Sequence, residues 1–100
     1  MLSKQEAKAV ALVQARIEVS EIPTDDEIVI VDEVTVERSW GWNFFYTSTR
    51  WQETQDINFA IAGNAPLLVE KSTGKCHVAG TAFPIQRYIE NFERTGSPHG

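Results

Sequence analysis

Cysteine, basic side chains and long apolar runs are all scarce in this chain of 100 residues. The single cysteine, Cys76, excludes an internal disulfide and a zinc site built from several thiolates. No apolar run approaches the roughly 20 residues that a membrane span needs. The stretch from Met1 to Ala15 lacks the charged-then-apolar layout of a signal peptide. We therefore expect a cytoplasmic protein that does not enter a membrane.

Basic residues are outnumbered, because 9 Lys and Arg face 14 Asp and Glu and leave a net charge of −5. Nucleic-acid binding depends on clustered cations that meet phosphates, so a nucleic-acid partner is not expected. A basic protein is the more natural partner. The 42% hydrophobic content is enough for one ordinary domain at this length. We expect that domain to occupy residues 1–96, with residues 97–100 as a flexible tail.

A helix is predicted near the start of the chain, from Lys4 to about Glu18. Ser3 lies three residues before Glu6, the spacing at which a hydroxyl and a carboxylate satisfy helix-start N–H groups reciprocally. The segment is rich in alanine and has no glycine or proline. We expect its core-facing side to carry β-branched residues at helical spacing, with alanines at the flanks: Val10, Val13 and Ile17, flanked by Ala7 and Ala9.

A strand is predicted over Glu27–Glu37, after a break at residues 22–26 that contains Pro23. Alternation places most of its apolar side chains on one face: Ile28, Ile30, Val34 and Val36. Asp32 falls on the same face, so we expect a bulge or bend near Asp32–Glu33.

A second strand is predicted over Trp42–Trp51, after a turn at Ser39–Trp42 that includes Gly41. Its two faces both carry aromatic side chains: Trp42, Phe44 and Tyr46 on one, Phe45 and Trp51 on the other. A strand that is apolar on both faces is expected in the interior of a sheet.

The second half of the chain predicts a hairpin followed by a helix. Residues 52–65 are expected to be partly ordered, as a short edge strand or a turn of helix. Strands over Pro66–Glu70 and Cys76–Ala82 flank a turn at Ser72–Lys75. A helix then starts at Pro84 and ends at Gly96. Its apolar stripe follows helical spacing: Ile85, Tyr88, Ile89 and Phe92. The order predicts an α+β fold with an N-terminal helix, an antiparallel sheet of four or five strands and a C-terminal helix packed on the sheet.

Patterns typical of catalysis or metal binding are weak. Cys76 and His77 are neighbours on a predicted strand, so their side chains point to opposite faces. The acidic run at residues 25–27 lacks the alternation and glycine of a calcium loop. Gly74 and Lys75 lack the second glycine of a phosphate-binding loop. We expect no enzyme, metal or cofactor, and a catalytic role for Cys76 or His77 stays as the remaining alternative.

Two tryptophans stand out because they lie at the ends of the aromatic strand. Arg38 lies two residues before Trp40, and Arg50 directly precedes Trp51. Tryptophan and arginine are enriched at the energetic centres of protein interfaces. Partly exposed tryptophans here would indicate recognition of another protein.

Several short motifs together resemble the immunity protein 35 family, which includes YrhB-like proteins. They are Gly41–Tyr46, Ala62–Val69, Thr73-Gly74, Gly80–Ala82 and Tyr88-Ile89. The resemblance implies a bacterial protein that binds a cognate toxin encoded nearby and blocks it. It carries over eight motif residues whose chemistry is that of turns and core: Trp42, Phe44, Gly63, Asn64, Pro66, Gly74, Gly80 and Thr81.

The partner-binding residues are expected outside these motifs, on acidic segments and at the ends of the aromatic strand. They are Asp25, Asp26, Glu27, Asp32, Glu33, Trp40, Arg50, Trp51, Glu53 and Asp56. An acidic surface that serves only solubility is the alternative for these carboxylates. For the whole chain the alternative is a holdase chaperone that binds apolar segments of client proteins. We expect a monomer or a weak homodimer.

Overall fold

A computed structural model describes residues 1–19, 26–55 and 65–100, and it has an α+β architecture. Residues 22–25 of the predicted break and residues 56–64 of the predicted segment 52–65 lie outside the described residues. The described chain contains three α-helices, one 3-10 turn and six strands. They are α1 (Lys4–Glu18), β1 (Ile28–Ile30), the 3-10 turn η1 (Asp32–Val34), β2 (Val36–Arg38), β3 (Gly41–Phe44), β4 (Tyr46–Ser48), α2 (Thr49–Thr54), β5 (Leu67–Glu70), β6 (Cys76–Val78) and α3 (Ile85–Thr95).

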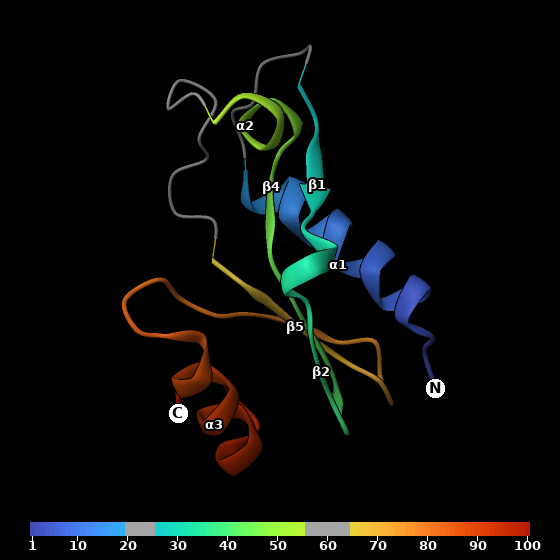
Figure 1. Ribbon diagram of the computed structural model, residues 1–100. Helices are drawn as coiled ribbons and strands as arrows, with labels where there is room; N and C mark the ends of the chain where they lie inside the picture. Colours follow the sequence, from blue (N-terminus) through green and yellow to red (C-terminus); the bar gives the residue numbers. More distant parts are fainter. Residues whose placement is uncertain (20–25, 56–64) are drawn as a thin grey trace.

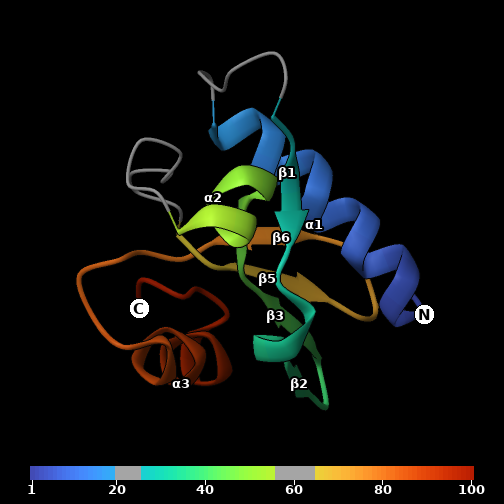
Figure 2. The same cartoon turned by 45° about the horizontal axis from the view of Figure 1, so that its top comes forward.

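The strands form two antiparallel sheets, one of four strands in the order β2-β3-β5-β6 and one that pairs β1 with β4. β3 is interior in the larger sheet, as predicted, and its Trp42 pairs with Val69, which pairs with Cys76. α1 and α3 lie on opposite sides of this sheet (Figures 1 and 2). The core is therefore split into one cluster under α1 and a smaller one under α3.

α1 has the predicted bounds and the predicted capping box, but its buried face differs from the prediction. Ala7, Ala11 and Ala15 are fully buried, whereas Val13 is 58% and Ile17 is 67% exposed. Small residues four apart let the helix backbone approach the sheet closely, and the sheet supplies the large side chains of the cluster. Of the predicted stripe, only Val10 is partly buried against this cluster, and the choice of Val13 and Ile17 was wrong. Hydrophobicity alone does not tell which face fits against a surface rich in aromatics.

The strand predicted over Glu27–Glu37 is broken at the place where Asp32 opposed the apolar pattern. β1 ends at Ile30, and η1 turns the chain before β2 begins in the other sheet. The turn brings Asp32 within 2.9 Å of the Lys8 ammonium at the surface. Val34, predicted on the core face, is 49% exposed instead. A carboxylate is costly to bury without partners, and the turn avoids that cost.

The strand predicted over Trp42–Trp51 is interrupted at Phe45 and ends three residues early, so that β3 and β4 belong to different sheets. Its aromatic face is confirmed, because Trp42, Phe44 and Tyr46 are buried in the cluster under α1. The Ser48 hydroxyl accepts a hydrogen bond from the Trp51 N–H at 3.0 Å and begins α2 as its N-cap. Trp51 therefore lies on a helix and not on a strand.

The predicted hairpin and the last helix are confirmed. β6 is shorter than predicted and ends at Val78. Pro84 precedes α3, and Gly96 ends it with a φ of 84°. Tyr88, Ile89 and Phe92 form its buried stripe. The last four residues fold back onto the domain, where the Asn91 amide donates to the carbonyl of Pro98 at 3.1 Å and the His99 ring lies 2.9 Å from the carbonyl of Val78.

Candidate protein-binding site

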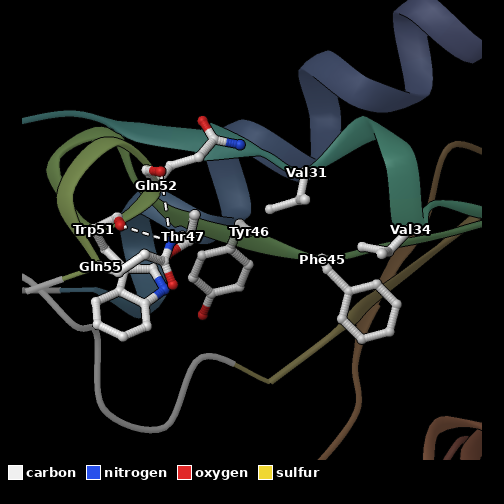
Figure 3. Close-up of a pocket in the computed structure, with 8 residues that line it drawn as sticks. All are labelled: Val31, Val34, Phe45, Tyr46, Thr47, Trp51, Gln52 and Gln55. Carbon is white, nitrogen blue, oxygen red and sulfur yellow. Dashed lines mark hydrogen bonds between the residues drawn. The ribbon is translucent and has the colours of Figure 1, made fainter. Parts of the chain in front are cut away.

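A hollow of about 430 Å³ opens between η1, β4 and α2 (Figure 3). Its walls are mainly apolar, with two glutamines among the lining residues. The lining consists of Val31, Val34, Phe45, Tyr46, Thr47, Trp51, Gln52 and Gln55. Its volume lies near the lower end of the roughly 300–1,000 Å³ typical of ligand sites.

Local backbone geometry directs these side chains into the hollow. Phe44 and Tyr46 face α1, so Phe45 between them faces the other way. The Val31 N–H donates to the carbonyl of Phe45 at 2.9 Å and joins the two sides of the hollow. On α2, Trp51 shares one side with Gln52 and with the C-cap residue Gln55.

The position of α2 is set by the carboxylate of Asp26. Its Oδ1 accepts hydrogen bonds from the Glu27 N–H at 2.8 Å and from the Arg50 N–H at 3.1 Å. Burial raises the pKa of Asp26, but the Arg50 and Glu27 N–H donors, together with the Ser48 hydroxyl and the Arg50 charge, hold the pKa below its usual value. Asp26 is only 7% exposed, so our placement of it on a partner-facing surface is corrected. It ties the start of β1 to α2.

Carboxylates lie beside the hollow on η1. Asp32 and Glu33 are exposed, and they directly precede Val34, which lines the hollow. The Lys8 ammonium pairs with Asp32, whereas Glu33 makes no ion pair within residues 1–19, 26–55 and 65–100. Glu53 is exposed but lies on the other side of α2 from Trp51 and Gln55, by the 3.6-residue helical period.

The structure thus divides the predicted partner-binding residues. Trp51, Asp32 and Glu33 belong to the surroundings of the hollow. Trp40 lies elsewhere, with its ring 4.4 Å from that of Phe92 and its indole N–H 2.9 Å from a Glu93 oxygen. Of the rest, Arg50 and Glu53 lie on α2, and the Glu27 carbonyl accepts the Thr49 N–H at the start of that helix. Asp25 and Asp56 fall outside the described residues.

Of the eight lining residues, only Trp51 was among the named partner-binding candidates. The other seven are Val31, Val34, Phe45, Tyr46, Thr47, Gln52 and Gln55. One sequence signal pointed to Val34. Asp32 interrupted the apolar alternation, and a turn at that point necessarily releases Val34 from the core face. On α2 the sequence pointed to Trp51, because an arginine precedes it at the end of the aromatic strand.

The described motif residues act within the fold. Trp42 and Phe44 are buried under α1, and the Pro66 carbonyl accepts the Ala79 N–H at 2.9 Å. Gly74 has a φ of 74° in the hairpin turn, which favours glycine. Gly80 lies beside the Tyr88 hydroxyl of α3, and Thr81 is exposed. Gly63 and Asn64 are outside the described residues.

Cys76 and His77 lie on opposite faces of β6, as expected from the strand. Cys76 packs against the cluster under α1, and burial raises the pKa of its thiol to about 11. The His77 ring faces α3, 4.9 Å from the Phe92 ring and 2.6 Å from a Glu70 oxygen. Within the described ranges, no three His, Cys, Asp or Glu side chains gather to hold a metal ion. None of the described helices has the length and apolar character to span a membrane.

Comparison with known proteins gives two matches. A family model described as Immunity protein 35 matches residues 7–93. YrhB of Escherichia coli (strain K12), described as an uncharacterized protein, is 33% identical over 69 residues, which cover 69% of this chain and 73% of that protein. No solved structure matches the chain.

Proposed function

The chain belongs to the immunity protein 35 family, and from this premise we propose that it binds a cognate bacterial toxin and neutralises it as a stoichiometric complex. The toxin is encoded nearby, and the complex forms in the cytoplasm of the producing cell. Inhibition requires only that the toxin surface is covered, so the protein acts without catalysis.

The observation that carries this proposal is the apolar hollow between η1, β4 and α2. Interfaces draw most of their affinity from a few anchors that enter desolvated pockets. Val34 and Trp51 offer partly exposed apolar surface there, and the Asp26 hydrogen bonds hold α2 in place. A preorganised site loses little conformational entropy on binding.

The acidic character of the protein supports a basic partner. A net charge of −5 raises the encounter rate with a cationic toxin, and salt screens that effect. Glu33, which has no ion-pair partner in the described part of the chain, is available to a cation of the toxin.

Titration against the product of the neighbouring reading frame tests the proposal. We expect a saturable one-to-one complex by calorimetry and loss of the toxin's activity at equimolar ratio. Replacing Trp51 with alanine should weaken the complex about 30-fold, the equivalent of an interface anchor worth about 2 kcal/mol.

The matched control is Trp40→Ala, because Trp40 is also partly exposed but packs against α3. We expect its affinity to stay within about threefold of the wild type. Circular dichroism checks that both variants fold. Equal losses from Trp40→Ala and Trp51→Ala would contradict the placement of the interface, and no complex with the wild type would contradict the function.

A holdase chaperone is the second candidate. Val13 and Ile17 lie one helical turn apart on α1 and are 58% and 67% exposed, so together they offer apolar surface to client segments. This function predicts weak binding to several unrelated unfolded proteins and suppression of their aggregation. A single saturable partner would favour the immunity function instead.

A further inference from the structure

We propose that the hollow receives one large apolar side chain of the toxin, carried on a segment with Lys or Arg on both sides of it. This inference rests on the proposed function and specifies the chemistry of the partner at the same site.

The size and lining of the hollow favour a single apolar anchor. About 430 Å³ accommodates one large side chain with its immediate backbone, but not a whole helix, whose diameter is about 10–12 Å. Val31, Val34, Phe45 and Trp51 present carbon surface, and no charged side chain among the described residues lines the space. An aromatic or long aliphatic side chain gains most from such walls.

The surroundings of the hollow favour cations beside that anchor. Asp32 and Glu33 precede the lining residue Val34 on η1, and Lys8 is the cation paired with Asp32. The Gln55 amide N–H groups are used at the end of α2, where they lie 3.0 Å from the Trp51 carbonyl and 3.5 Å from that of Gln52. The Gln55 side-chain oxygen accepts no hydrogen bond from the described residues, so it can accept one from Lys or Arg.

The same charges argue against a second copy of this chain as the occupant. Each copy carries a net charge of −5, so an acidic surface would meet another acidic surface. Charge complementarity therefore selects a basic partner.

Three tripeptides test this chemistry without the toxin: acetyl-Lys-Trp-Lys-amide, acetyl-Glu-Trp-Glu-amide and acetyl-Lys-Ala-Lys-amide. We expect the first to shift the nitrogen-15 amide resonances of Thr47, Trp51 and Gln52 saturably at low salt. It should bind about fivefold more tightly than the Glu-Trp-Glu peptide, because two exposed ion pairs replace two repulsions. The Lys-Ala-Lys peptide should not saturate. Equal binding of the two Trp peptides, or shifts confined to other elements, would overturn the inference.

Two matched pairs of variants connect the hollow to the toxin. Val34→Gln and Val13→Gln change the same residue type at similar exposure, 49% and 58%, but only Val34 lines the hollow. Glu33→Lys and Glu90→Lys change the net charge equally, and Glu90 lies on the outer side of α3. We expect Val34→Gln and Glu33→Lys to weaken the toxin complex about tenfold and the two controls less than threefold.

The outcomes separate this inference from the proposed function. A one-to-one toxin complex that tolerates Val34→Gln and Glu33→Lys would overturn the anchor and leave the immunity function standing. Selective binding of the Lys-Trp-Lys peptide without a toxin complex would support the anchor chemistry and contradict the immunity function for that toxin. Concentration-dependent shifts of the hollow in the free protein would indicate a second copy and overturn the inference.

Discussion

Replacing Gly41 with alanine should destabilise the four-stranded sheet more than any other single methyl group added at a described glycine. A Cβ at this position would lie 1.9 Å from the Val69 carbonyl oxygen, about 1 Å closer than real atoms approach. The obstacle is the backbone of β5, which pairs with β3 in the interior of the sheet. Relief requires the two strands to separate where Gly41 pairs with Glu70 and where the Lys71 N–H donates to the Trp40 carbonyl at 2.7 Å.

Two to three weakened backbone hydrogen bonds, at about 0.5–1.5 kcal/mol each, place the loss at about 2–4 kcal/mol. That loss is a large share of the unfolding free energy of a domain, which is typically about 5–15 kcal/mol. The control is Gly96→Ala, where φ is 84° but no atom lies within 4 Å of the added Cβ, so only backbone strain of about 1 kcal/mol is expected. Urea unfolding, followed by tryptophan fluorescence, gives the change in unfolding free energy for both variants. Equal losses in the two variants would refute the steric argument.

Three further perturbations test other parts of the structure. The pKa of Asp26 is lower in the folded state than in the unfolded state. Its ionised carboxylate therefore stabilises the fold above the unfolded-state pKa near about 4, and this stabilisation is lost as the pH falls through the folded-state pKa. The urea midpoint of the wild type should therefore fall more steeply than that of Asp26→Asn on acidification below about pH 5, and parallel curves would contradict this. With a pKa of about 11, Cys76 should react with iodoacetamide at pH 8 at least about 100-fold more slowly in the folded protein than in urea, as read by mass spectrometry. Gly80→Ala would place a Cβ 2.6 Å from the Tyr88 hydroxyl, which accepts the Phe83 N–H, and should cost about 1–2 kcal/mol of unfolding free energy. The cost should shrink in a Tyr88→Phe background, and strict additivity of the two substitutions would argue against the contact.

Local chemistry predicted the elements that depend on it. The reciprocal hydrogen bonds of Ser3 and Glu6 start α1, and the αL conformation of Gly96 ends α3. Turn residues and alternation were likewise sufficient for the hairpin of β5 and β6. These signals act over a few residues, so no tertiary information is needed to interpret them.

The face that α1 buries was not predictable from hydrophobicity. The alanine face and the valine face lie side by side on the helix, and the choice between them depends on the shape of the sheet surface. Trp42, Phe44 and Tyr46 fill the space under the helix, so alanine fits there where valine would separate the layers. Such complementarity requires knowledge of both partners.

Part of the candidate site was predictable. The acids on η1 and the tryptophan at residue 51 were both chosen from the sequence, because charge and residue type are visible there. Val34 and Phe45, which supply apolar walls, were not selected. Alternation assigned Val34 to the core face and gave Phe45 no binding role. The partner-facing position proposed for Asp26 was wrong, because its carboxylate is required by the backbone N–H groups of Glu27 and Arg50.

Two places where the chain departs from a continuous strand build the hollow, and the first of them is the bend predicted near Asp32–Glu33. If β1 continued into β2 without η1, Val34 would return to the buried face and Asp32 and Glu33 would lie along a strand. If β4 continued past Ser48, Trp51 would lie on the sheet and α2 would form no wall. Asp32 and Ser48 are the residues that stop the strands, one by its cost of burial and the other by capping a helix. Departures from local regularity concentrate at functional sites, so these two interruptions support the choice of the hollow as the candidate site.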